Sequence, residues 1–306
     1  MPMPGSTAIR LALLCLAFTG CTQPAAAPAK RYVLRIAVTD PYLKATYSQL
    51  SDISIEDVTP AGASVLTVMN LQRGIVDVSV ALADAAYLGY TGQLEEAPGP
   101  FDQLRGMAVL DLNTLHLLVG ANTHIHSIDQ LKGRHVALGP TGSSGAVIAE
   151  TLLKANGLTV AGVRGERVSH LEAVERLATR DFDAAFVIQI PGNGPVMQAT
   201  RGGARLLDVD GPLIEEIRQH RPYLRRTLIP KGVYPGQDKP IRTIGVDRVL
   251  ICRADVPEGI VYRLLDAYFS ARPEGTPPAD LERAPATPLP LHPGAARYYR
   301  QRELSR

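Results

Sequence analysis

The chain has 306 residues, 45% of them hydrophobic and 20% charged, which is enough to bury a sizeable core in about two domains. Its formal net charge is +2, and Lys and Arg are scattered without a long run of one sign. This balance excludes the strongly basic surface of a typical nucleic-acid-binding protein, so we expect no nucleic-acid partner.

The first twenty residues have the form of a secretory signal peptide, because a positive charge precedes the short apolar run Leu11–Phe18. About eight apolar residues are too few for a membrane-spanning helix, which needs roughly 20. The four residues that end at Cys21 resemble a bacterial lipobox, although Phe18 stands where an aliphatic residue is usual. We therefore expect residues 1–20 to be removed and Cys21 to be lipidated, with simple export as the alternative.

Residues 21–31 would then form an Ala- and Pro-rich, lipid-anchored linker. This predicts a periplasmic lipoprotein held at a membrane, and Thr22 lacks the acidic character often linked to inner-membrane retention, which favours the outer membrane. Cys252 would be the one unmodified cysteine of the mature chain, so the sequence predicts no internal disulfide and a fold that depends on its core.

The first part of the mature chain alternates apolar, β-branched runs with helical segments, as parallel sheets with crossover helices do. Ser64 and Asp84 are each placed to cap the start of a helix. Gly74 and Gly89 stand where these two helices would end. The predicted strands are residues 32–38, 53–58 and 75–80.

A second unit of the same kind follows. Its predicted strands are residues 115–119, 134–138, 183–188 and 204–209, and its predicted helices are residues 146–156, 171–179, 195–202 and 213–220. A strand at 243–252, a helix at 258–269 and a terminal amphipathic helix around Tyr298 and Tyr299 complete the chain.

These patterns predict an α/β fold with two lobes and a ligand cleft between them. Residues 32–120 would form lobe 1 and residues 121–242 lobe 2, and residues 243–306 would return to lobe 1 and supply the C-terminal helices.

The strongest candidate for a binding site is the loop Gly139–Gly145, which lies between a predicted strand and a predicted helix. Glycines let backbone N–H groups approach a ligand, the helix start adds partial positive charge, and hydroxyls come from Thr141, Ser143 and Ser144. No Lys follows the last glycine, so it is not a Walker A loop, and Ala146 stands where a nucleophile elbow needs a second glycine. The loop therefore suits a carboxylate or phosphate, with a tight turn and an ordinary helix cap as the alternative.

Two further polar segments follow predicted strands. Residues 59–64, with Gly62 and Ser64, form a second strand-to-helix loop, and Gln189 could present its amide to the cleft. Asp84 is interpreted as a helix cap rather than a ligand contact. We find no nucleophile with a base and an orienting group, and no His or Cys pattern of a metal site, so we expect no catalysis, metal or cofactor.

Several of these motifs, in this order, resemble the TAXI-type receptors of TRAP transporters. They include residues 59–92, the step from Leu131–Gly133 into the glycine-rich loop, and Phe182–Val187. Residues 229–237 and 290–295 are similar to further signatures of that family, so the resemblance covers most of the mature chain.

The resemblance implies a periplasmic receptor, a monomer, that closes on a small carboxylate ligand, glutamate-like or a dicarboxylate, and delivers it to a TRAP-type membrane permease. It also implies that loops of both lobes line the cleft. The expected ligand-binding residues are Thr39, Tyr42, Gly62, Ser64, Thr141, Gly142, Ser143, Ser144, Gly145 and Gln189.

The segment after the first strand departs from this family. A glycine-rich loop with paired aromatics is usual there, whereas this chain has Thr39–Tyr47, without glycine and with an acidic residue at Asp40. The ligand could therefore differ from the family's. The alternative function is that of an orphan ligand-sensing lipoprotein that acts on a membrane signalling partner.

Overall fold

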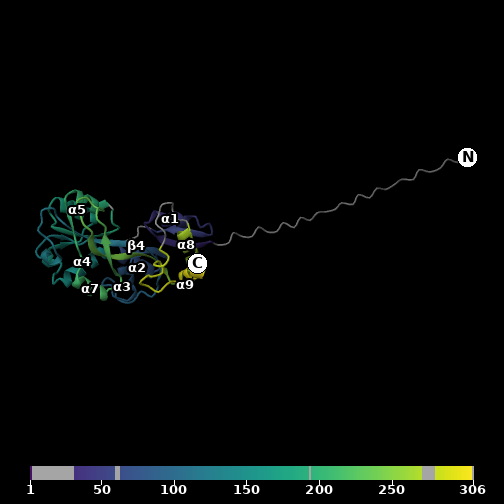
Figure 1. Cartoon of the computed structure of the whole chain (residues 1–306). Helices are drawn as coiled ribbons and strands as arrows, with labels where there is room; N and C mark the ends of the chain where they lie inside the picture. The colour runs from purple at the N-terminus through teal and green to yellow at the C-terminus, as the bar shows by residue number, and fades with distance from the viewer. Residues whose placement is uncertain (2–30, 59–62, 193, 271–279, 305–306) are drawn as a thin grey trace. The chain divides into compact units, whose positions relative to one another are not determined.

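The structure is a computed structural model that describes Met1 and residues 31–58, 63–192, 194–270 and 280–304 (Figure 1). Residues Tyr32–Arg306 form one compact unit. The predicted signal peptide, Cys21 with most of its linker, and Gly62 lie outside the described residues. Among the described helices, none combines the length and the apolar character that crossing a bilayer requires.

The described strands form one mixed sheet in the order β2-β1-β3-β10-β4-β7-β5-β6, with β8 paired to β4 and β9 paired to β10. The strands are β1 (Tyr32–Ala37), β2 (Ile53–Asp57), β3 (Val78–Leu82), β4 (Leu104–Val119), β5 (Val136–Ala137), β6 (Gly165–Glu166), β7 (Ala184–Gln189), β8 (Arg205–Leu207), β9 (Leu224–Ile229) and β10 (Ile241–Arg253).

The helices fall into two groups, labelled in part in Figure 1. We use lobe 1 for β1–β3 with α1 (Pro41–Ser48), α2 (Ser64–Gln72), α3 (Ala83–Tyr90), α8 (Glu258–Ser270) and α9 (Pro293–Leu304). We use lobe 2 for β5–β9 with α4 (Ser144–Ala155), α5 (His170–Ala178), α6 (Gly194–Arg201) and α7 (Pro212–Gln219).

Two long antiparallel strands, β4 and β10, run through both lobes. The C-terminal half of β10 pairs with β3 of lobe 1, and its N-terminal half pairs with β9 of lobe 2. The N-terminal part of β4 pairs with β10, and its residues Thr114–Val119 pair with β7. The chain therefore passes between the lobes inside two strands, near Thr114 and Gly245, which face each other in the ladder.

The strands that pair with β4 or β10 are antiparallel to them, and the remaining strands of each lobe pair in parallel, as predicted. In lobe 1, β1 lies between β2 and β3, and in lobe 2, β5 lies between β6 and β7. Helices with apolar faces cover these strands; in α5, for example, Ala173, Val174 and Leu177 are buried. The repeat of buried positions one turn apart is what an amphipathic helix on a sheet requires.

The predicted C-terminal helix is confirmed. In α9 the side chains of Tyr298 and Tyr299 are buried against α8 and the sheet. The Tyr299 hydroxyl donates to the carbonyl oxygen of Met107 in β4 at 2.9 Å. The last helix of the chain is thereby fastened to the strand that both lobes share.

Two elements differ from the sequence interpretation. A strand is predicted only at residues 115–119, but β4 is one continuous strand from Leu104 to Val119, and the polar residues Asp111–Asn113 lie where it is half-buried. Between the predicted helix at 213–220 and the predicted strand at 243–252 no further element is predicted, yet β9 lies there. The polar residues Arg225–Thr227 interrupt the apolar pattern by which a strand is predicted, because the middle of β9 is more exposed to solvent than its ends.

Gly245 should be irreplaceable at the crossing of the two lobes. A Cβ atom there would lie 2.7 Å from the Asn113 carbonyl oxygen and 3.0 Å from Leu112 Cδ1. We expect Gly245→Ala to lower the free energy of unfolding by about 1–3 kcal/mol in urea titrations, because the ladder must shift to admit the methyl group. Gly259→Ala in α8, which would meet nothing within 4 Å, is the control and should be neutral or stabilising by up to about 1 kcal/mol. Equal effects of the two changes would contradict this account.

Candidate functional site

The ends of β3 and β7 meet at the middle of β4. Leu82, the last residue of β3, pairs with Arg248, which itself pairs with Asp111 of β4. Gln189, the last residue of β7, pairs with Thr114 of β4. Along the strand direction these two ends are three residues, or about 10 Å, apart, with β10 and β4 between them. The start of α3, directly after β3, and the loop after β7 therefore both lie at the junction of the lobes.

The glycine-rich loop leads from β5 into α4 as predicted. Gly139 and Gly142 have φ angles of 97° and 68°, which only glycine adopts readily. The Ser143 hydroxyl accepts a hydrogen bond from the Ala146 amide at 3.2 Å and caps the helix. The helix begins at Ser144, two residues before the predicted start.

The start of α4 is buried and offers hydrogen-bond donors. Ser144 and Gly145 are both buried, whereas Thr141 is exposed. The backbone amides of Ser144 and Gly145 belong to the first turn of α4, where N–H groups have no hydrogen-bond partner within the helix. The same turn carries the positive end of the helix dipole. An anion at this position would therefore be stabilised by charge and by backbone donors together.

Asp84 lies at the same junction, which corrects its interpretation as a helix cap. The residue before α3 is Leu82, and no side chain caps this helix. Asp84 is fully buried in the first turn, and its Oδ1 accepts a hydrogen bond from the Ser144 hydroxyl of α4 at 2.6 Å. Burial raises the pKa of its carboxyl to about 6, against the lowering effect of this bond. Asp84 thus connects lobe 1 to lobe 2.

Ser64 has a different role from the cap that was predicted. Ala63 precedes α2 as its N-cap residue, and no side chain caps the helix. The Ser64 hydroxyl instead accepts a hydrogen bond from the Leu82 amide at 3.2 Å, which ties the start of α2 to the end of β3. A Cβ atom on Gly142 would lie 3.8 Å from Ala63 Cβ, so the start of α2 also approaches the lobe 2 loop.

Gln189 belongs to a buried polar cluster in lobe 2 that sequence reasoning missed. Its side chain hydrogen-bonds Tyr234, whose hydroxyl lies 2.8 Å from His116 Nε2 and accepts from the Gly192 amide at 2.9 Å. Burial lowers the pKa of His116 to about 4, so its ring is neutral. These residues are far apart in sequence, so only the pairing of β4 with β7 could reveal the cluster.

His170, the first residue of α5, approaches the start of α4. Its Nε2 is buried without a hydrogen-bond partner among the described residues. The same atom would lie 3.9 Å from a Cβ placed on Gly145. Burial lowers the pKa of His170, which favours a neutral ring that can donate or accept one hydrogen bond.

On the lobe 1 side, Asp40 is used structurally. Its Oδ1 accepts hydrogen bonds from the amides of Tyr42 and Leu43 and caps α1, and its Oδ2 accepts from Arg248 at 3.0 Å. The acidic charge noted in the sequence is therefore balanced. The predicted ligand residue Tyr42 instead has its hydroxyl engaged inside lobe 1, where it donates to the Tyr268 carbonyl oxygen. Thr39 is exposed after β1.

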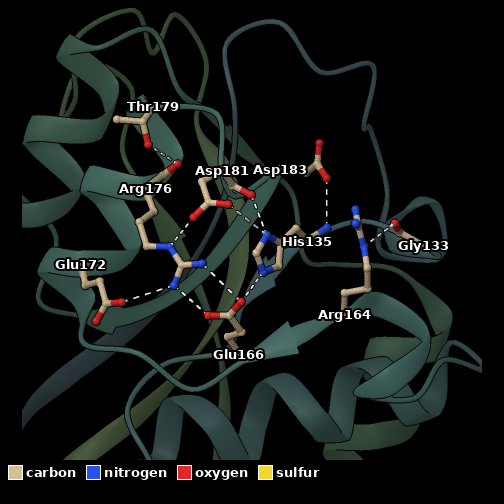
Figure 2. Close-up of polar contacts among 9 residues, drawn as sticks. All are labelled: Gly133, His135, Arg164, Glu166, Glu172, Arg176, Thr179, Asp181 and Asp183. Carbon is tan, nitrogen blue, oxygen red and sulfur yellow. Dashed lines mark hydrogen bonds and ion pairs between the residues drawn. The ribbon is translucent and has the colours of Figure 1, made fainter.

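A second polar cluster, shown in Figure 2, lies elsewhere in lobe 2. The two ring nitrogens of His135 contact the Asp181 carbonyl oxygen and the Glu166 carboxylate. Arg176 binds Glu166 and Asp181, and Arg176 and His135 together lower the pKa of Glu166 to about 2. Each polar group is engaged by another, so the cluster fastens α5 to β5 and β6 and offers no vacant position for a ligand.

Metal binding finds no support in the described part of the chain, which contains no group of three or more His, Cys, Asp or Glu side chains able to hold an ion. His124 and His126, the nearest pair in the sequence, are both exposed. Of the predicted site residues, the structure therefore gathers Ser64, Ser143, Ser144 and Gly145 near Asp84, and it places Gln189 at the end of β7.

Comparison with protein families gives one match over most of the chain. Residues 43–302 match the model of the NMT1-like family. The match includes lobe 1 from Leu43 onwards, lobe 2, the strands that connect the lobes and most of α9.

Solved structures with a similar fold are binding proteins. The periplasmic aliphatic sulphonate-binding protein SsuA from Escherichia coli matches with a TM-score of 0.50 and 16% identity, over 89% of this chain and 71% of that one. The alkanesulfonate-binding protein SsuA from Xanthomonas axonopodis pv. citri, bound to MOPS, also has a TM-score of 0.50 and 16% identity, over 89% of this chain and 84% of that one. The chain therefore has a mixed α/β periplasmic-binding-protein fold.

The buried Asp84 should make stability fall as pH rises. Its pKa is raised from 3.8 to about 6 in the folded protein, so between these values the folded state binds more protons than the unfolded state. A shift of about 2 units corresponds to about 3 kcal/mol. The wild type should lose this contribution as pH rises, whereas Asp84→Asn has no carboxyl to titrate. The free energy of unfolding of Asp84→Asn minus that of the wild type should therefore be about 2–3 kcal/mol larger at about pH 7.5 than at about pH 4.

Urea unfolding of both proteins at the two pH values measures this gain. A difference between the proteins that does not change with pH would show that Asp84 titrates as an exposed carboxyl does.

Proposed function

Because the chain belongs to the NMT1-like family, we propose that it is the extracytoplasmic solute-binding receptor of a TRAP-type transporter. In this role it captures a small anionic solute between its lobes and delivers it to a membrane permease. The observation that carries the proposal is the start of α4, where a glycine- and serine-rich loop and a buried helix N-terminus lie at the junction of the lobes. Such a terminus binds carboxylates and phosphates.

The arrangement of the shared strands supports closure on a ligand. The lobes are connected within β4 and β10, and polar residues occupy the crossing. Small changes of backbone angle in two strands can move one lobe against the other, as in the hinge motions of periplasmic receptors. The lobes would part to admit the solute and close with Ser143, Ser144 and Gly145 against it.

The TAXI-type resemblance supports the narrower assignment. In the family, the loop that corresponds to Thr141–Gly145 is expected to line the ligand cleft. In this chain that loop leads into a helix start with the hydrogen-bond donors that an anion needs. The solved sulphonate-binding proteins hold oxyanions according to their names, which agrees with an anionic solute here. This role requires no catalysis. It includes export to the periplasm with Cys21 as a lipid anchor.

A thermal-shift screen tests the proposal. Residues 22–306 would be heated with amino acids, dicarboxylates, sugars and phosphates, each at a concentration far above the expected dissociation constant. A solute that binds only the folded state must raise the unfolding midpoint. At 100 times the dissociation constant it stabilises the folded state by about 2.7 kcal/mol. If every solute in the panel leaves the midpoint unchanged, capture of a solute of these classes fails.

Gly145→Ala should weaken anion binding without weakening the fold. A Cβ atom there would make only ordinary contacts, at 3.4 Å or more, but it would stand beside the amide that an anion approaches. Losing one hydrogen bond to a charged group costs about 1.5–3 kcal/mol, or roughly ten- to hundredfold in affinity, measurable by titration calorimetry.

The matched control for this change is Gly259→Ala, which makes the same substitution at the second residue of α8. It should leave the affinity unchanged. A Gly145→Ala variant that binds the solute as tightly as this control would place the anion elsewhere.

A further inference from the structure

Asp84 is a fully buried carboxylate with only one oxygen engaged by a side chain. Its Oδ1 accepts from Ser144, and its Oδ2 is buried without a hydrogen-bond partner among the described residues. A buried carboxylate oxygen that lacks a donor costs free energy, because water no longer solvates it. In the described chain, Asp84 thus has one acceptor position that the protein leaves empty.

No cationic side chain offsets this charge in the part of the chain that the structure describes. The groups that lower the pKa of Asp84 are the Ser144 hydroxyl and the amides of α3 itself, and desolvation outweighs them. Tyr223 is near enough for Asp84 to raise the pKa of its phenol, and its ring lies 5.7 Å from that of Tyr87 across the lobes. The nearby Arg221 hydrogen-bonds Tyr223 and does not lower the pKa of Asp84, so among the described residues the ionised carboxylate has no direct cationic partner.

The opposite side of the same junction offers donors rather than acceptors. The first amides of α4, at Ser144 and Gly145, belong to a buried helix start. His170 brings a buried Nε2 without a partner towards Gly145. The Ser144 hydroxyl at the start of α4 hydrogen-bonds the Asp84 carboxylate of lobe 1. A hydrogen-bond acceptor in lobe 1 and hydrogen-bond donors in lobe 2 therefore lie next to each other.

We propose that the solute carries an ammonium or amine N–H donor that binds Asp84 Oδ2, beside an oxyanion that binds the start of α4. This inference rests on the proposed function and specifies its solute class. An ammonium group would form a charge-assisted hydrogen bond with the empty oxygen and neutralise the buried carboxylate. The two lobes then contribute opposite charges to one zwitterionic solute.

A dicarboxylate without an amine fits the same site poorly. Its carboxylates would add negative charge next to Asp84, and like charges in a buried site oppose ionisation of each other. Closure around such a solute would leave Oδ2 without a donor. Asp84 therefore selects against the amine-free acid, although both acids suit the helix N-terminus alone.

Titration calorimetry with matched solutes tests this inference on residues 22–306. The probes are two pairs that differ only by the amine, L-glutamate with glutarate and L-aspartate with succinate. In the wild type we expect at least a tenfold lower dissociation constant for the amine-bearing member of at least one pair. In Asp84→Asn, which keeps the size and the acceptor for Ser144, this preference should disappear.

Asp102→Asn is the control, because it makes the same chemical change at an exposed carboxylate of the segment between α3 and β4, outside the site. It should keep the preference of the wild type. Circular dichroism and the thermal midpoint verify that Asp84→Asn is folded.

The outcomes separate the two proposals. Equal affinity of the wild type for both members of each pair, or a preference that survives in Asp84→Asn, would overturn the amine contact while solute capture stands. If neither pair binds and the thermal-shift panel finds another solute that lacks an N–H donor, the amine contact is likewise overturned. If no solute binds at all, the proposed function falls and the inference falls with it.

Discussion

The antiparallel ladder between β4 and β10 is the constraint on which the rest of the structure depends. It runs from the pair of Leu104 and Arg253 to the pair of Thr114 and Gly245, and each lobe adds its parallel strands to one end of it. Two irregularities in register, next to Val249 and Ile251, let the ladder bend within lobe 1. Because both lobes grow from the same two strands, backbone pairing brings the start of α3, directly after β3, and the loop after β7 to the junction of the lobes.

Charged groups at this crossing are balanced, which distinguishes them from Asp84. Arg248 of β10 lies 3.0 Å from both Asp40 and Asp111. Its neighbour Asp247 is contacted by Arg225 of β9 and by Arg283. Buried ion pairs that keep their partners avoid the large cost of an isolated charge. Among the described residues Asp84 lacks such a partner, which is the contrast on which we base the proposed contact with the solute.

Local sequence patterns predicted most helices and strands. The spacing of apolar residues, the residues that end helices and the positions of glycines each depend on only a few neighbouring residues. The loop from Gly139 to Gly145 is the clearest case, since a strand, a turn with positive φ and a helix start all leave local signals. The continuity of β4 escaped prediction because Asp111 and Asn113 resemble a turn, although they are the half-buried middle of a strand.

The candidate site was predicted only on the side where local signals exist. Asp84 was interpreted as a cap because acidic residues at helix starts usually are, and its true partner, Ser144, lies on another lobe. The cluster of His116, Tyr234 and Gln189 has no local signature either, because each residue comes from a different element. Such contacts depend on strand order, which a single sequence does not display.

The position of β10 also determines when the protein can complete its fold during synthesis or refolding. β10 separates β3 from β4, so Ser79 must pair with Ile251 and Ala108 with Leu250, although each pair is far apart in the sequence. Contacts this distant in sequence slow folding, because loop closure must precede the energy they return. Until β10 arrives, β3 and β4 each expose an apolar edge that can pair with other chains. The strand that we propose as part of the hinge therefore also gives the nascent chain a prolonged, aggregation-prone stage.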